Sequence, residues 1–468
     1  MSTTMIKKLY KTYTVVLAVL ILSASCTKLD LQPTDIIDPS KAYRNINDIN
    51  MGILGVYALL DYTQISMNAT VTDEATYPTE NNVGNSDAYR WLYNPSSGSV
   101  TSLYGSYYQA IDRANRTLAG LQALAFTGAE ATTASRYKGE LLALRAYLHF
   151  ELLRAYASSY QASALGVPYM KTSEIGYPPR DNFEVVISNT KADLAEAKPL
   201  IAATSTDKTR ISNRLIVAAI QARVALYEKN WADAVTYSSE VIAGAPLATK
   251  AQFPGIWTDA NDNEVIWKLK RVGTTDSRVG DFFFRQSGGL VLYAPALKLI
   301  NTFDQVNDIR YPAYIKFDAT RTGIKSPYLV NKYIGGTSTA PGLTDIKLFR
   351  TGEMYLIRAE AEAESTGDAA GDLNALRAAR INGYTNSTFA DKQALIDAIY
   401  TERYKELAFE GHRFYDLKRR NLPVQRLAAD AANASGAVTL LPTQAQYAFP
   451  IPAQEVLINK STVQNPNY

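Results

Sequence analysis

The sequence predicts a mainly α-helical protein, a scaffold of tetratricopeptide-like helical hairpins that carries a loop-rich region and small β elements. Two observations predict the helices. Apolar residues recur at helical spacing over long stretches. Several of these stretches form pairs, and one pair has the small residue and closing proline of a helical repeat. A third observation predicts the loops: other segments are rich in Gly, Pro, Asn and Ser and have no long apolar stripe.

The chain opens with an export signal. Three lysines precede a short apolar run at residues 13–22, and small residues lead from it to Cys26, the only cysteine. The run is far shorter than the roughly 20 residues that a membrane-spanning helix needs. We therefore expect residues 1–25 to be a cleaved signal peptide, Cys26 to carry a lipid, and residues 26–40 to form an extended spacer. The alternative is an ordinary secretory signal with an incidental cysteine.

Composition excludes several kinds of function. Removal of the signal takes the net charge from +3 to about zero, which argues against nucleic acid, because lysine and arginine supply most of that affinity. Once Cys26 is lipidated, no disulfide and no cysteine–metal bond can form. Two histidines, His149 and His412, leave little for imidazole chemistry, so we expect no metal and no cofactor. The 31 tyrosines suit a surface that binds polar, ring-shaped ligands.

Helices are expected through most of the first half of the mature chain. Apolar periodicity places them near residues 41–60, 103–118, 141–156, 183–201, 213–229 and 231–243. Between the first two, residues 62–102 break into Pro, Gly, Asn and Ser. Long irregular stretches inside compact domains are usually functional.

Three helical hairpins are predicted further along. Residues 227–246 have the aromatic, alanine and proline spacing of the second half of a tetratricopeptide repeat. Residues 353–380 form another hairpin that turns at Gly367, and residues 396–417 form a pair split at Gly411.

Residues 41–468 are expected to form one unit in three parts. The N-terminal helical part, residues 41–249, contains the irregular stretch. The loop-rich insertion, residues 250–345, holds short β-type runs at 265–267, 282–284 and 290–293 among Gly and Pro turns. The C-terminal helical part is residues 346–468.

The usual catalytic motifs are absent. His149 begins no zinc-binding H-E-x-x-H, and neither a nucleophile elbow nor a phosphate loop occurs. The best acidic set is Glu402, Glu406 and Glu410, at i, i+4 and i+8 of one helix. Such carboxylates could serve a glycosidase. The favoured interpretation is a structural ion-pair network, and we expect no enzyme.

An aromatic cluster in the irregular stretch suits carbohydrate. Its rings lie among amides and carboxylates, and flat rings stack on sugar faces while the polar groups bond hydroxyls. The rings are Tyr77, Tyr89, Trp91 and Tyr93, and the polar neighbours are Asp73, Asn81, Asn82, Asn85 and Asn94. The alternative for any single ring is an anchor that fixes the loop to the scaffold.

One segment near the C-terminus resembles a known family. Residues 399–420 (IYTERYKELAFEGHRFYDLKRR) are similar to the C-terminal signature of the SusD/RagB family of outer-membrane nutrient-binding lipoproteins. Further similar motifs follow the family's order along nearly the whole mature chain, at residues 26–33, 108–115, 144–150, 350–361, 449–452 and 464–468.

The resemblance implies a function. It implies a lipoprotein on the outer face of the outer membrane that binds a nutrient, usually a glycan, and delivers it to a SusC-like TonB-dependent transporter. Membrane contact would be through the lipid anchor alone. The alternatives are a peptide ligand and a scaffold that binds only proteins. The expected ligand contacts are Asp73, Tyr89, Trp91, Asn94 and Tyr293.

Overall fold

A computed structural model describes most of the chain. The described residues are Thr3, 5–7, 42–83, 86–273, 275–285, 289–335 and 341–468. Cys26, the spacer and most of the predicted signal peptide lie outside these residues. Within the described part, no helix is both long and apolar enough to cross a membrane.

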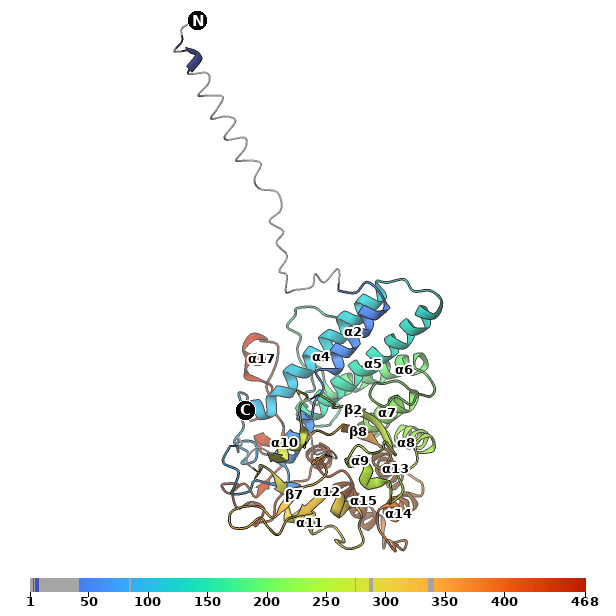
Figure 1. Cartoon of the computed structure of the whole chain (residues 1–468), viewed down its shortest axis with the longest axis vertical. Coiled ribbons are helices and arrows are strands. Elements are labelled where there is room, and N and C mark those ends of the chain that lie inside the picture. The colour runs from blue at the N-terminus through green and yellow to red at the C-terminus, as the bar shows by residue number, and fades with distance from the viewer. Residues whose placement is uncertain are drawn as a thin grey trace.

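The protein is mainly α-helical, as predicted. The long helices of the first half are α2 (Ile46–Tyr57), α4 (Gly98–Gln122), α5 (Gly128–Tyr156), α6 (Phe183–Leu200), α7 (Arg214–Glu228) and α8 (Trp231–Gly244). Each lies where apolar periodicity predicts a helix. Helices α2, α4, α5 and α6 pack side by side along one side of the molecule (Figure 1).

One helix was missed in the stretch expected to be irregular. Helix α3 (Thr63–Val71) has no apolar stripe, because polar residues occupy most of it. Two of them turn back onto its own backbone: Asn68 donates to the Gln64 carbonyl, and Thr70 donates to the Ser66 carbonyl. The helix is stabilised by tertiary packing against α4 and α16 (Arg413–Arg419), which periodicity alone does not reveal.

Two predicted hairpins are present, α7–α8 and α13 (Thr351–Glu364) with α14 (Ala369–Arg380). The third predicted helix pair is formed by α15 (Lys392–Glu406) and α16, but α15 packs on α13 and α14, whereas α16 packs on α3. Gly367 and Gly411 lie at the two predicted turns with φ of 152° and 80°. Only glycine adopts such positive φ values readily, so these residues allow the chain to reverse.

The rest of the described chain is loops, short helices and two-stranded antiparallel sheets. The short helices are α9 (Phe253–Trp257), α10 (Val279–Phe283), α11 (Leu297–Ile300), α12 (Arg310–Tyr314), the 3-10 turn Ala445–Tyr447 and α17 (Ala453–Ile458). The strand pairs are β1 (Ala75–Thr76) with β5 (Ala294–Pro295), β2 (Val265–Leu269) with β8 (Ile346–Arg350), β3 (Phe284–Arg285) with β4 (Leu290–Val291), β6 (Ile315–Phe317) with β7 (Tyr328–Val330), and β9 (Val424–Gln425) with β10 (Thr439–Leu440).

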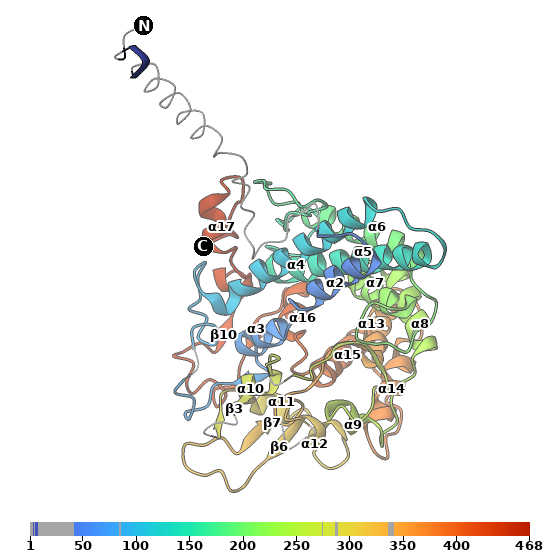
Figure 2. The ribbon, with the colours of Figure 1, turned by 45° about the horizontal axis from the view of Figure 1, so that its top comes forward.

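Two of these sheets join segments that are far apart in sequence. Strand β2 pairs with β8, and β1 pairs with β5. The β-type run predicted at residues 282–284 is instead mostly the end of α10, because three consecutive phenylalanines are apolar in either geometry. Helices α4–α6 lie on one side of the molecule, and α12, β6 and β7 lie on the other (Figure 2).

Candidate ligand-binding site

Five aromatic rings form a continuous row, which we call the aromatic row. Tyr62 contacts Phe282 with ring centroids 6.3 Å apart, and Phe282 stacks on Tyr293 at 4.7 Å. Tyr77 follows at 5.9 Å from Tyr293, and Tyr89 at 5.8 Å from Tyr77. Tyr62 and Phe282 are half-buried, whereas the other three are buried. The row therefore has a solvent-accessible end and a buried end.

Strand pairing brings these rings together. Thr76 of β1 lies opposite Ala294 of β5, so the residues just outside the pair, Tyr77 and Tyr293, become neighbours. Phe282 stands near the end of α10, and Tyr62 immediately precedes α3. The row is thus a product of two segments more than 200 residues apart in sequence.

Carboxylates flank the accessible end of the row. Burial raises the pKa of the Tyr62 hydroxyl, and the nearby charges of Asp61 and Asp281 raise it further. Burial also raises the pKa of Asp281, against the opposing charges of Arg278 and Arg285. The Tyr62 hydroxyl therefore keeps its proton at neutral pH. This end offers two ring faces beside a hydrogen-bond donor and two carboxylate acceptors.

Two of the predicted contacts lie in the interior. Tyr89 donates its hydroxyl proton to the Asp430 carbonyl at 2.5 Å, and Trp91 donates Nε1–H to the Val71 carbonyl at 2.9 Å. The Arg426 guanidinium lies 3.9 Å from the Tyr89 ring centroid and 4.3 Å from that of Trp91. Trp91 is only 8 % exposed. In this structure Trp91 anchors the loop to the scaffold, which was the alternative to a ligand contact for a ring in this cluster.

Asp73 is also internal. Its carboxylate accepts hydrogen bonds from Arg413 at 2.7 and 2.8 Å and from Lys298 at 2.7 Å. Burial alone would raise the pKa of Asp73, but the charges of Arg413 and Lys298 outweigh it and hold that pKa well below its usual range. Asp73 is thus an ionised link between α16 and α11.

The remaining predicted contacts differ in their placement. Tyr293 belongs to the aromatic row, and burial raises its pKa to about 12. Asn94 is exposed, and its side-chain oxygen accepts a hydrogen bond from the Ser96 N–H in the turn before α4. A ligand role for all five residues stays a prediction. Sequence reasoning missed Tyr62 and Phe282, which no motif distinguishes from other aromatic residues.

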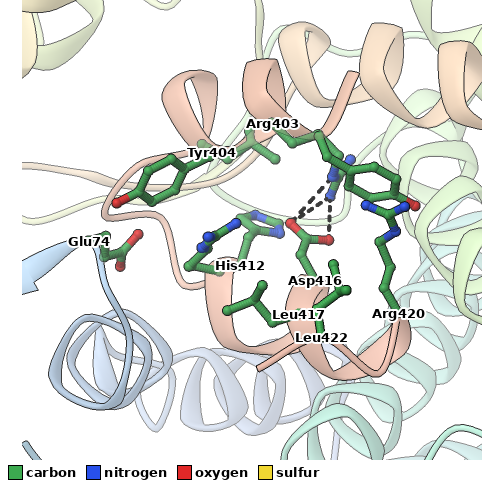
Figure 3. A pocket seen from close by; sticks show the side chains of 11 residues that line it. Glu74, Arg403, Tyr404, His412, Asp416, Leu417, Arg420 and Leu422 are labelled. Carbon is green, nitrogen blue, oxygen red and sulfur yellow. Dashed lines mark hydrogen bonds and ion pairs between the residues drawn. The ribbon is translucent and has the colours of Figure 1, made fainter. Parts of the chain in front are cut away.

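A small cavity lies within the C-terminal signature (Figure 3). Its volume is about 30 Å³, which holds water but no sugar ring. Arg403, one of its lining residues, is paired with Asp416 at 3.0 Å. On the opposite side of the cavity, burial raises the pKa of Glu74 to about 8, although the Phe409 N–H donates a hydrogen bond to its carboxyl group. This cavity is too small to be the nutrient site.

The acidic set of the signature is a buried ion-pair network. Glu406 contacts Arg310, Arg350 and Arg380, each at 3.0 Å, and all four side chains are fully buried. Burial would raise the pKa of Glu406, but the three arginines hold it well below its usual range.

The two flanking glutamates are paired in the same way. Glu402 is 2.7 Å from Arg310 and 2.7 Å from Arg377, and despite burial its cationic neighbours lower its pKa to about 2. Glu410 is 2.6 Å from Arg350 and 2.7 Å from Lys332. The network interpretation of the three glutamates is confirmed.

The fold is thus a scaffold of helical hairpins that also carries a loop-borne aromatic row. Within the described residues, no group of three or more acidic, histidine or cysteine side chains is placed to hold a metal. The chain matches two family models. One, described as the SusD family, covers residues 304–468; the other, described as "Starch-binding associating with outer membrane", covers residues 30–226. The chain belongs to the SusD/RagB family.

Relatives and solved structures agree with this assignment. SusD-like protein P38 of Formosa agariphila is 21% identical over 90% of this chain and 92% of its own. The starch-binding protein SusD of Bacteroides thetaiotaomicron is 36% identical over 27% of this chain and 22% of its own.

Two solved structures show the same fold. A SusD superfamily protein from Bacteroides vulgatus has a TM-score of 0.80 at 22% identity and covers 91% of this chain and 100% of its own. A laminarin-binding SusD-like protein has a TM-score of 0.71 at 20% identity, and the match covers 91% of this chain and 100% of its own.

Proposed function

We propose that this protein is a lipoprotein on the outer face of the outer membrane that binds a nutrient glycan at the aromatic row. It then hands the glycan to a SusC-like TonB-dependent transporter. Family membership supports the role, and the accessible end of the row, formed by Tyr62 and Phe282, supports the ligand class. The observation that carries the proposal is that these two rings stay partly accessible to solvent although three further rings pack behind them.

The chemistry of this end suits a sugar chain. A ring face covers the apolar face of a sugar, and adjacent carboxylates accept hydrogen bonds from its hydroxyl groups. Asp61 and Asp281 lie close enough to Tyr62 to act on its pKa. Because the rings behind them fix the geometry of Phe282, little ordering is required on binding.

A glucan is the first ligand to test. Two similar proteins are named for starch and for laminarin, and both polymers are built of glucose. The signature carboxylates already bind arginines, so they are not available to cleave the chain. We therefore propose binding without hydrolysis.

Calorimetric titration tests the site. The mature chain carrying Cys26→Ser is titrated with laminarin and with soluble starch. Phe282→Ala and Tyr62→Ala should each weaken glucan binding at least tenfold, because each removes a stacking face. The matched control is Phe317→Ala, which removes a ring that is 55% exposed on β6.

Two results would contradict the proposal. If Phe282→Ala and Tyr62→Ala bind glucan with wild-type affinity, the aromatic row is not the binding site. If the mature chain releases heat on titration with peptide mixtures and none with glycans, the ligand is a peptide rather than a glycan.

The role of the lipid is tested separately. Cys26→Ala should leave glucan affinity of the purified chain unchanged and abolish growth on that glucan when it replaces the wild-type protein in cells. Normal uptake by the unlipidated protein would show that Cys26 only sorts the chain.

A further inference from the structure

A long groove lies far from the aromatic row, on the helical side of the molecule. Its volume is about 970 Å³. It runs between the C-terminal half of α4, α5, α6 and the loop at residues 171–175. We call it the entry groove, because Ala42 and Tyr43, the first residues of the main described part of the chain, form part of its wall.

Tyr43 fixes the position at which the chain enters. Its hydroxyl lies 2.9 Å from Thr117 Oγ1 of α4. Its ring lies directly on Gly120, where an added Cβ would come within 2.4 Å of the ring. Because Gly120 has no side chain, the Tyr43 ring can approach α4 closely at this point.

The groove has an apolar floor and a charged rim, in which Arg116 is paired with Asp112 at 2.8 Å and Lys138 with Glu196 at 2.6 Å. Leu118 and Leu142 line the floor, and Ile175, 99% exposed, stands at its edge. The charged residues of the wall are Arg116, Lys138, Arg145, Lys171, Glu174 and Glu196. An almost fully exposed isoleucine beside an apolar floor is typical of a surface that another segment covers.

The sequence just before Ala42 contains apolar residues that could cover this floor. Residues 34–41 read TDIIDPSK, with Ile36 and Ile37 between Asp35 and Asp38. The match to the family model described as "Starch-binding associating with outer membrane" begins at residue 30, so these residues belong to the family's domain rather than to an arbitrary linker.

We propose that residues 34–41 dock in the entry groove, with one isoleucine of the Ile36–Ile37 pair against the apolar floor, since successive side chains of an extended segment point to opposite faces. Docking shortens the tether. Fully extended, residues 27–41 would reach about 50 Å, whereas residues 27–33 alone reach about 23 Å. The lipid on Cys26 would then hold the helical side near the membrane and restrict how the protein can turn.

Hydrogen–deuterium exchange tests the docking. In the mature Cys26→Ser chain, amides of residues 34–41 should exchange at least tenfold more slowly than in a synthetic peptide of the same sequence. Ala119→Trp places a large ring in the groove from an exposed position of α4 and should return the exchange to the rate of the peptide. Ala129→Trp, at an exposed position of α5 outside the groove, is the matched control.

The reciprocal variant changes the segment. Ile36→Asp with Ile37→Asp should also abolish protection, while circular dichroism shows an unchanged helical fold. Exchange in the wild type at the rate of the peptide, or full protection in Ala119→Trp, would overturn the proposal. Glucan titration of Ala119→Trp should match the wild type, so failure here is distinguishable from failure of the proposed function.

Discussion

The aromatic row and the ion-pair network use opposite kinds of contact. In the row, rings stack and one end stays accessible, with Tyr62 and Phe282 half-buried. In the network, Glu406 and its three arginines are fully buried, and each charge has a partner. A region whose contacts are completed internally supports the fold, whereas a region that leaves ring faces open can bind a ligand.

The network also shows that acidic residues at regular helical spacing need not be catalytic. Glu402, Glu406 and Glu410 look like catalytic carboxylates in the sequence, yet all three bind cations inside the protein. Because a buried, paired carboxylate cannot reach a substrate, residue type and spacing alone do not identify a site.

The largest effect is expected in the network. Glu406→Gln leaves three buried arginines short of one negative charge and should lower the free energy of unfolding by about 3–5 kcal/mol. Urea denaturation measures it. The control is Glu364→Gln, which removes an exposed ion pair with Lys392 and should change stability by less than about 1 kcal/mol. Equal losses of stability in the two variants would contradict the conclusion that the buried network stabilises the fold more than an exposed ion pair does.

A smaller loss is expected at Asp73, which links α16 to the segment that carries Tyr77. Asp73→Asn should lower stability by about 2–3 kcal/mol, less than at Glu406, because the Arg413 and Lys298 side chains are 16% and 31% exposed. The measurement is urea denaturation of the wild type and Asp73→Asn in parallel.

The effect of Asp73 should depend on pH in one direction. Its pKa in the folded protein lies below the usual value of about 3.9, so the ionised carboxylate contributes stability above that value. The stability difference between wild type and Asp73→Asn should shrink as the pH falls below about 4. A difference that grows at low pH would contradict the ion-pair assignment.

A substitution of Trp91 tests whether this buried ring, which lies outside the aromatic row, binds ligand. Trp91→Phe keeps a ring under Arg426 but removes the hydrogen bond to the Val71 carbonyl. Stability should fall by about 1–2 kcal/mol, with glucan affinity within twofold of the wild type by calorimetry. Unchanged stability together with a tenfold loss of affinity would instead support the sequence-based prediction that Trp91 contacts the ligand.

The smallest effect is expected at an exposed ring outside the aromatic row. Phe317 lies opposite Tyr328 across the β6–β7 pair, with ring centroids 5.1 Å apart. Cross-strand pairs of this kind contribute about 0.2–1 kcal/mol, so Phe317→Ala should lower stability by less than about 1 kcal/mol. A shift in the thermal unfolding midpoint measures it, and a large loss of glucan binding in the same variant would place the site elsewhere.

The helices were predictable and the site was only partly so. Periodic apolar residues and the turns at Gly367 and Gly411 are local signals, and the structure follows them. The aromatic row needs β1 to pair with β5, a contact between distant segments that no local pattern reports. Tyr77 and Tyr89 were grouped because they share one irregular stretch, whereas Tyr62 and Phe282 were not predicted to join them.

The sequence by itself determined the helical class, the hairpins, the absence of the usual catalytic motifs and the family resemblance, because each depends on short-range spacing or on a contiguous motif. Tertiary structure decided which polar and aromatic residues are free to act. It placed Trp91 and Asp73 inside, gave the signature glutamates arginine partners, and left Tyr62 and Phe282 accessible. Burial and pairing depend on contacts between distant parts of the chain, and only the folded arrangement specifies them.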